Sequence, residues 1–196
     1  MCISEKCIVA VESIVPAFVK QLEENGVYYI DNETEMLQLT KTVLNHDMKM
    51  VRKMEGKSAM DILEEAGIHP NRPVRLVVVR TFAKHPLVLE ECLMPVVPLV
   101  AVADFEEALE TALFTEQGYR HTAMVHSQCI DRLSKAAKIM NTTVFIKNGS
   151  SLAGIGLNGE EMASFTIANV TGEGITTARD FACKRSCTLT SGFSLR

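Results

Sequence analysis

The sequence has no long apolar run, no block of like charges and no C-x-x-C pair of cysteines. Its richest apolar stretch, CLMPVVPLVAVA, is too short to cross a bilayer and contains two prolines. Basic residues are dispersed among acidic ones and the formal net charge is −4, which argues against a nucleic-acid groove and against a basic patch for membrane surfaces. We therefore expect neither nucleic acid nor a membrane among the partners.

The cysteines and the first residues indicate the compartment. Cysteines stand at positions 2, 7, 92, 129, 183 and 187, and no set of cysteines and histidines has zinc-finger spacing. His121 and His126 lie five residues apart, which on a strand places them on opposite faces, so we expect no metal site there. The first residues contain no apolar h-region and no cleavage site, so we expect no secretory signal peptide. Reduced thiols and a cytoplasmic location fit this pattern best.

Apolar strands alternate with amphipathic helices in the part of the chain before Asn148. Strands are predicted at 6–11, 74–82, 96–103, 121–127 and 142–148, and helices at 13–25, 32–48, 58–68, 104–118 and 128–141. Such alternation is typical of βα units around a largely parallel sheet, so the fold class is α/β. The chain has 196 residues, of which 47% are hydrophobic, and this is enough for one domain with a sizeable core.

From Asn148 onward the pattern changes. The stretch NGSSLAGIGLNGEE predicts a glycine-rich loop, residues 174–184 a short helix, and SCTLTSGFSLR a terminal strand. Gly154, Gly156 and Gly159 spell G-x-G-x-x-G, but the first glycine does not directly follow a strand and two glutamates after the motif would repel a pyrophosphate. We interpret these glycines as part of a loop, not as a dinucleotide site.

Several longer stretches resemble one enzyme family. They are EECLMPVVPLVAVADFEEAL, GYRHTAMVHS followed by TTVFIKNGSSLAGIG, and FTIANVTGEGITTARDFACKRSCTLTSGFSLR. They resemble the CoA-acylating aldehyde dehydrogenases of ethanolamine and propanediol utilisation, over essentially the whole chain. The resemblance implies the catalytic domain of that family at 1–184, with three layers and a mostly parallel sheet covered by helices on both faces. It also implies an oligomerisation strand at 185–196 and the absence of the nucleotide-binding domain that comes first in the family.

The resemblance also implies a reaction, in which an aldehyde, CoA and NAD give an acyl-CoA and NADH through a cysteine thioester. Cys2 matches the family's nucleophile, because it stands just before a Glu-Lys pair and an apolar strand. His121 matches a histidine near that thiol, with a role in proton transfer or in stabilising the thiolate. Glu91 matches the glutamate that binds the nicotinamide ribose, and Asn148 begins the loop that lines the aldehyde pocket. Cys7 is the rival thiol, and we expect it to be packed.

The resemblance leaves other questions open. It implies a homo-oligomer joined through the terminal strand, and it adds the lumen of a bacterial microcompartment to the cytoplasm as a location. It does not separate acetaldehyde from propionaldehyde, and a fragment without the nucleotide domain could be inactive.

Two alternatives remain beside the dehydrogenase. One is a hydrolase that uses an N-terminal Cys2 with its own amine as base. The other is a non-catalytic protein that joins full-length subunits through the C-terminal strand.

Overall fold

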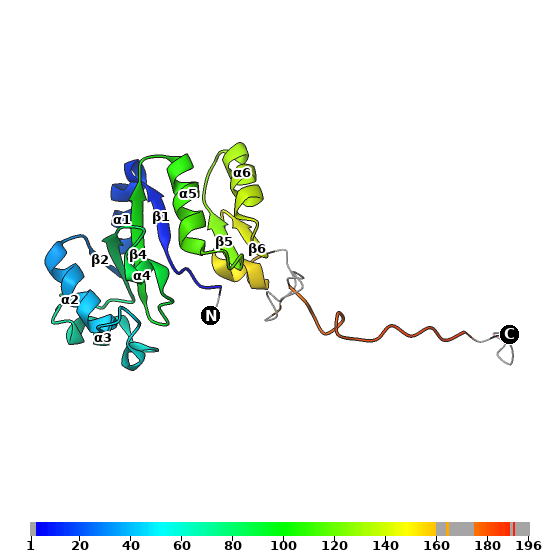
Figure 1. Cartoon of the computed structure of the whole chain (residues 1–196), viewed down its shortest axis with the longest axis horizontal. Coiled ribbons are helices and arrows are strands. Elements are labelled where there is room, and N and C mark those ends of the chain that lie inside the picture. Colours follow the sequence, from blue (N-terminus) through cyan, green and yellow to red (C-terminus); the bar gives the residue numbers. More distant parts are fainter. Residues whose placement is uncertain (1–2, 160–163, 165–174, 189, 191–196) are drawn as a thin grey trace.

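The computed structural model of the chain describes residues 3–159, 164, 175–188 and 190. Four strands form a parallel sheet in the order β1-β4-β3-β2, and two more form a separate parallel pair, β5-β6 (Figure 1). The strands are β1 (Ile8–Val11), β2 (Val27–Ile30), β3 (Leu76–Thr81), β4 (Val96–Val102), β5 (Thr122–Val125) and β6 (Val144–Lys147). The helices are α1 (Val15–Glu24), α2 (Glu33–Val43), α3 (Ala59–Glu65), α4 (Pro86–Leu89), α5 (Phe105–Glu116) and α6 (Ile130–Met140). Short 3-10 helices are η1 (Glu12–Ile14), η2 (Arg52–Met54) and η3 (Ser151–Ile155).

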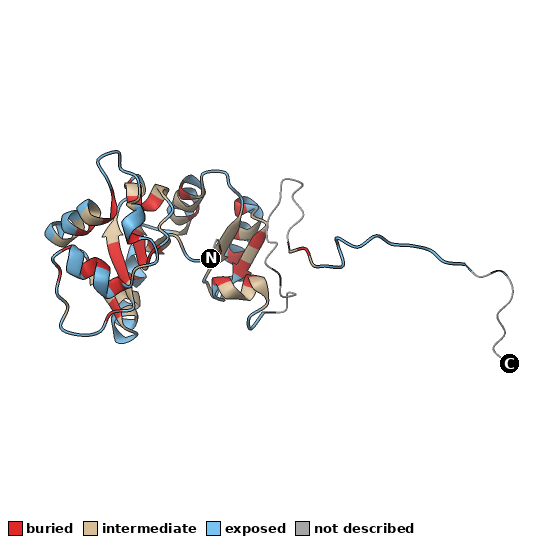
Figure 2. Ribbon diagram, turned by 90° about the horizontal axis from the view of Figure 1, so that it is seen from below, coloured by how far each residue is buried: buried red, intermediate tan, exposed pale blue. Residues whose placement is uncertain are grey.

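Apolar residues on both faces of the four-stranded sheet make it the middle of three layers. Val78 of β3 and Leu99 of β4 face the side covered by α1, where they pack with Val15. Val77 and Val79 of β3 face the opposite side and pack with the buried residues of α2 and α3. Because side chains alternate along a strand, a central strand needs apolar residues at successive positions to bury both faces. The predicted α/β architecture is confirmed, and Figure 2 shows the buried residues gathered between the layers.

The helix α5 joins the two-stranded sheet to the four-stranded one. Its Ala108 packs in the cluster around Val100 of β4, while its Leu109 packs with Ala136 of α6. Asp104 is the N-cap of the helix, and its carboxylate accepts hydrogen bonds from the backbone N–H groups of Glu106 at 2.9 Å and Glu107 at 3.0 Å. The helix therefore presents one side to each sheet, and Figure 1 shows it between them.

Glycines allow η3 to lie directly on β6. A Cβ atom at Gly154 would lie 2.5 Å from Cγ1 of Val144, and one at Gly159 would lie 2.5 Å from the carbonyl oxygen of Ala153. Gly156 ends η3 with a left-handed φ of 93°, which glycine adopts without strain. The glycines of the G-x-G-x-x-G pattern thus have packing and turn roles, which agrees with the loop interpretation. The 3-10 helix inside that loop was not predicted.

The predicted elements were incomplete: α4 and η2 were not predicted, and further differences concern residues 175–184 and β2. The helix predicted at 174–184 is wrong for its described part, residues 175–184, where Asp180 accepts hydrogen bonds from N (2.7 Å) and Oγ1 (2.9 Å) of Thr177 in a turn. Such local side-chain bonds compete with helix formation. The strand β2 was not predicted at all. Residues 185–188 and 190 are exposed and form no strand among themselves, and the rest of the predicted terminal strand lies outside the described residues. That strand stays a prediction.

Candidate functional site

Cys2, which the resemblance matches to the nucleophile, lies outside the described residues, and Ile3 follows it directly in the chain. The side chain of Ile3 is 1% exposed and packs with Val144 and Ile146 of β6. Residues of η3 complete this cluster. The segment that follows Cys2 is therefore anchored on the two-stranded sheet before the chain enters β1 of the larger one.

The carboxylate of Glu5 binds the start of η3. Its Oε1 accepts a hydrogen bond from the backbone N of Ser151 at 3.2 Å, and its Oε2 accepts one from Oγ of Ser151 at 3.1 Å. The N-cap residue, Ser150, makes no side-chain capping bond. A carboxylate 146 residues away in the sequence thus satisfies a free N–H at a helical terminus, where negative charge is favoured.

The carbonyl oxygen of Leu89 receives two side-chain hydrogen bonds. Nζ of Lys6 donates one at 3.1 Å and Nε2 of Gln117 donates one at 2.8 Å. Leu89 ends α4, and the last carbonyl groups of a helix lack partners within it, so cationic and amide donors are favoured there. The segment after Cys2, the end of α4 and the residue that follows α5 therefore meet at one oxygen atom, two residues before Glu91.

Glu91 is exposed and makes no hydrogen bond or ion pair with any residue in the described part of the chain. Its neighbours are held, because Glu90 forms an ion pair with Lys49 and the carbonyl of Leu93 accepts a hydrogen bond from N of Gly56 at 3.0 Å. The loop thus presents a carboxylate with unused acceptor capacity on a fixed backbone. A carboxylate of this kind suits a ligand that offers two neighbouring hydroxyl groups.

Glu91 and the segment after Cys2 lie at the same edge of the four-stranded sheet. β1 and β4 are parallel neighbours, with Ile8 opposite Leu99. The residues that precede both strands are therefore at their common amino-terminal edge, which holds residues 3–7 and the loop of Glu91.

His121 comes immediately before β5 and is half-buried. Its Nδ1 lies 2.7 Å from Oγ1 of Thr122 in a hydrogen bond, and its carbonyl accepts a hydrogen bond from N of Val144 at 3.0 Å. The first bond restrains the ring at Nδ1, and the second fixes the backbone of His121. Nε2 makes no hydrogen bond within the described ranges, so it remains available for proton transfer.

Asn148 follows β6, and its side chain is occupied by the backbone. Oδ1 accepts a hydrogen bond from N of Ser127 at 2.8 Å, and Nδ2 donates one to O of Ser127 at 3.0 Å. The residue adopts a left-handed φ of 54°, which asparagine tolerates better than most residues. The amide of Asn148 therefore ties the loop after β6 to the loop after β5.

The structure does not bring His121 and Asn148 together. β5 and β6 are parallel, with Thr122 opposite Val144, so His121 lies at their amino-terminal end and Asn148 at their carboxyl-terminal end. Five residue steps at the rise of a strand separate the two positions by about 16 Å. The loop that begins at Asn148 instead contacts the segment after Cys2, because Ser151 of that loop is hydrogen-bonded to Glu5. Sequence reasoning missed the roles of Glu5, Lys6 and Ser151, although Glu5 and Lys6 belong to the motif that identified Cys2.

Two other thiols are packed and protonated. Burial raises the pKa of Cys7 to about 12 and that of Cys92 to about 12. Cys7 packs in the cluster of Val100, and Sγ of Cys92 donates to the carbonyl of Leu87 at 3.7 Å. The expectation that Cys7 is packed is confirmed, and a thiol with so high a pKa is a poor nucleophile near neutral pH.

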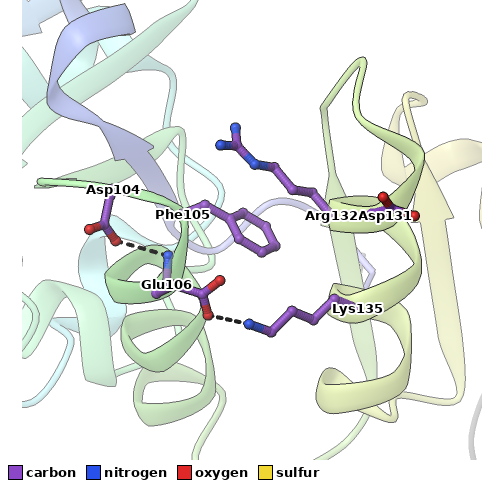
Figure 3. A pocket seen from close by; sticks show the side chains of 6 residues that line it. All are labelled: Asp104, Phe105, Glu106, Asp131, Arg132 and Lys135. Atoms are coloured by element: carbon purple, nitrogen blue, oxygen red, sulfur yellow. Dashed lines mark hydrogen bonds and ion pairs between the residues drawn. The ribbon is translucent and has the colours of Figure 1, made fainter.

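A groove of about 370 Å³ lies between the first turns of α5 and α6 (Figure 3). Its lining residues are Asp104, Phe105, Glu106, Asp131, Arg132 and Lys135. Each of the two basic groups already has a partner on α5: Lys135 forms an ion pair with Glu106, and the guanidinium of Arg132 lies 5.4 Å from the ring centroid of Phe105. The acidic groups outnumber the basic ones, so this groove does not suit the phosphates of a nucleotide or of CoA. It contributes to the contact between the two helices.

Other kinds of site find no support in the described residues. No three of their histidine, cysteine or acidic side chains gather so that they could hold a metal ion. None of the helices in the described ranges has the length and apolar character needed to cross a membrane. The pairings within both sheets are parallel, whereas the hydrolase alternative requires paired hairpins. That alternative loses its structural basis here.

Comparison with known proteins gives a consistent result, although no family model matches the chain. The chain is 44% identical to a propanal dehydrogenase (CoA-propanoylating) of Salmonella typhimurium, over 100% of its own length and 42% of the relative. It is 36% identical to the acetaldehyde dehydrogenase (acetylating) EutE of the same species, over 100% of the chain and 43% of the relative. The chain thus spans less than half the length of these relatives.

Solved structures agree with the sequence relatives. A propionaldehyde dehydrogenase of Rhodopseudomonas palustris with bound propionyl-CoA matches with a TM-score of 0.89 and 39% identity, over 96% of this chain and 42% of that one. The same protein has been solved with bound CoA and an acylated cysteine. A propionaldehyde dehydrogenase from the fucose utilisation microcompartment of Clostridium phytofermentans matches with a TM-score of 0.86 and 35% identity, over 100% of this chain and 45% of that one. It has also been solved with a cysteine or a histidine replaced by alanine.

Proposed function

We propose that this chain, which is homologous along its whole length to one part of the CoA-acylating aldehyde dehydrogenases, supplies the cysteine thioester chemistry of that family. The substrates are a small aldehyde, propanal or acetaldehyde, and CoA, with NAD as the oxidant. One observation carries the proposal on the structural side. The segment that follows Cys2 is held at Ile3, Glu5 and Lys6, at the same edge of the sheet as Glu91.

In the proposed reaction the thiolate of Cys2 attacks the carbonyl carbon of the aldehyde. An S–C bond forms and the electron pair of the C=O bond moves to oxygen. Bound NAD would supply the acceptor for the hydride of that carbon, and the acyl group would remain on Cys2 as a thioester. The thiol of CoA then attacks the thioester carbonyl, its proton passes to Nε2 of His121, and the bond to Cys2 breaks to release a thiolate. Acyl-CoA is the product.

Glu91 is the residue of this chain that we assign to NAD. Its exposed carboxylate has no partner among the described residues, and the loop around it is fixed at Glu90 and Leu93. Two ribose hydroxyl groups would each find an acceptor oxygen there. Binding the ribose at this position places the cofactor at the edge of the sheet where the segment after Cys2 lies.

Assembly and location follow from the same homology. We assign a homo-oligomer joined through residues 185–196, in line with the resemblance of that stretch to the family's strand between subunits. The location that we assign is the cytoplasm, including the lumen of a bacterial microcompartment. A relative of this chain comes from such a compartment, which supports the second location.

The acyl-transfer half of the reaction can be tested without NAD. The chain is incubated briefly with propionyl-CoA, and separately with acetyl-CoA, and its intact mass is measured before peptide mapping. The thiolate of Cys2 should displace CoA thiolate and retain one acyl group. Cys2→Ser should abolish the adduct, whereas Cys129→Ser, which removes an exposed thiol, should leave it unchanged. The acyl group that transfers faster identifies the preferred aldehyde.

A different result would redirect the assignment. An unmodified Cys2 in a chain with a folded circular-dichroism spectrum would refute thioester formation by this chain. Acylation at Cys129 with Cys2 unmodified would refute the choice of nucleophile. Co-purification of an unreactive chain with longer homologous subunits would support the assembly alternative.

A further inference from the structure

The interaction between Glu5 and Ser151 has a consequence for the reaction. Glu5 is three residues from Cys2 in the sequence, and both of its carboxylate oxygens bind the first residue of η3. We propose that Glu5 is a positioning residue for acyl transfer at Cys2, because it holds the segment that follows Cys2 against η3. This inference rests on the proposed function, because it takes Cys2 as the nucleophile.

Ser151, the residue that binds Glu5, is held in place by its surroundings. Ser151 is 3% exposed, and η3 lies so close to β6 that a Cβ at Gly154 would overlap Val144. A bidentate contact to such a site restrains the Glu5 side chain in two directions. Restraint of a reacting group can raise the rate of its reaction, because the productive orientation no longer has to be found at each encounter.

The contacts of Ile3 and Lys6, on either side of Glu5, allow the effect of Glu5 on the reaction to be distinguished from its effect on folding. Ile3 packs on β6 and Lys6 binds the carbonyl of Leu89 at the end of α4, and neither contact involves the Glu5 carboxylate. We expect both contacts to persist when that carboxylate is removed, while the bond to η3 is lost. We therefore expect loss of Glu5 to slow acyl transfer more than it destabilises the fold.

The experiment compares acyl transfer with simple alkylation of the same thiol. Glu5→Ala should lower the rate of Cys2 acylation by saturating propionyl-CoA by about tenfold or more, as small misplacements of reacting groups do. Alkylation of Cys2 by iodoacetamide, which requires no fixed orientation, should stay within about twofold. Glu110→Ala is the matched control, because Glu110 is an exposed carboxylate with no hydrogen bond within the described ranges.

A double-mutant cycle tests whether Glu5 acts through Ser151. Ser151→Ala removes the Oγ bond and keeps the backbone N–H, so it should slow acylation less than Glu5→Ala does. The double variant should be close to Glu5→Ala alone, because the two residues share one interaction. Glu5→Gln keeps an acceptor oxygen and should restore part of the rate. If Glu5→Ala does not fold, Glu5→Gln and Ser151→Ala carry the same prediction.

The possible failures are distinguishable. Normal acylation of Glu5→Ala, with a reactive wild-type chain, would overturn the positioning role and leave the proposed function intact. If Glu5→Ala lowered the acylation rate, the alkylation rate and the urea midpoint together, its role would be merely structural. That result would also overturn the positioning role. A wild-type chain that is not acylated at all would overturn both.

Discussion

The ammonium group of Lys6 donates a hydrogen bond of 3.1 Å to the carbonyl oxygen of Leu89, 83 residues further along the chain. The bond connects the segment that follows Cys2 to the loop that carries Glu91. It is partly buried, and Gln117 binds the same oxygen. Two regions that the sequence keeps far apart are thereby fixed relative to each other at one atom.

Lys6→Met should lower the free energy of unfolding by about 1–2 kcal/mol, because a charge-assisted hydrogen bond is lost while the aliphatic stem is kept. The loss stays modest because Gln117 still satisfies the carbonyl of Leu89. Urea unfolding followed by circular dichroism measures it. Lys84→Met, at an exposed lysine without a bonded partner in the described ranges, should change stability by less than about 0.5 kcal/mol. Equal effects of the two substitutions would contradict the structure.

Asn148→Ala should destabilise the chain by about 2–4 kcal/mol, since it removes both bonds to Ser127 and places alanine at a left-handed φ. Asn148→Gly should cost less, because glycine accepts that backbone conformation. Asn158→Ala is the control: Asn158 also has a left-handed φ, of 58°, but makes no hydrogen bond within the described residues. Asn158→Ala should cost only the strain of a left-handed backbone at alanine. The urea midpoints of the three variants measure these differences in stability.

His121→Asn should slow acylation of Cys2 by about 10²-fold or more at neutral pH, the usual contribution of a positioned acid or base. Asparagine retains a hydrogen-bonding group beside Thr122, so the urea midpoint should change little. His126→Asn, five residues along and exposed, should leave the rate unchanged. Initial rates from intact mass measure both variants. A fall in rate that is the same for the two histidines would argue against a proton-transfer role for His121.

The packed thiols predict a pH dependence of stability. Burial holds the pKa of Cys7 and that of Cys92 at about 12 in the folded chain, against an ordinary value of 9.0. Between these values the unfolded chain has released protons that the folded chain retains, so stability falls as pH rises from about 9 to 12. Urea midpoints measured across this window should fall less steeply for a Cys7→Ala, Cys92→Ala double variant than for the wild-type chain.

Peptide mapping gives an independent check on the same two thiols. Iodoacetamide at pH 8 should modify Cys129, Cys183 and Cys187, which are exposed, before it modifies Cys7 or Cys92. Rapid labelling of Cys7 in the folded chain would show that it is not packed, and it would restore Cys7 as a rival nucleophile.

Every strand except β2 was predicted from the sequence, and the two central strands carried the strongest signal. β3 and β4 are central strands with both faces buried, so their runs of valine and leucine identify them. β2 has four residues at the edge of the sheet, and its two tyrosines are only partly buried, so it lacks that signal. The turn at Thr177 resembled a helix because its composition permits one, while the competing bonds to Asp180 depend on geometry.

The candidate site was predictable only as a set of positions. The motif beginning at Cys2 and the positions of Glu91 and His121 came from resemblance, and no periodicity would have selected them. Their spatial relations come from the parallel pairing of β1 with β4 and of β5 with β6. The partner of Glu5 could not be inferred at all, because no pattern in a single sequence links a glutamate to a serine 146 residues away.

The attachment of residues 3–6 to Leu89 and Ser151 also sets an order of events. Loop closure over such long stretches is slow compared with the formation of a helix or a hairpin. Because η3 packs directly on β6, we expect the bonds of Glu5 to form only after β6 has formed. A competent thiol at Cys2 would then report that the last parts of the chain to associate have done so. Before those bonds form, residues 3–6 lack their attachment to η3, so we expect Cys2 to react as it would in an unfolded peptide.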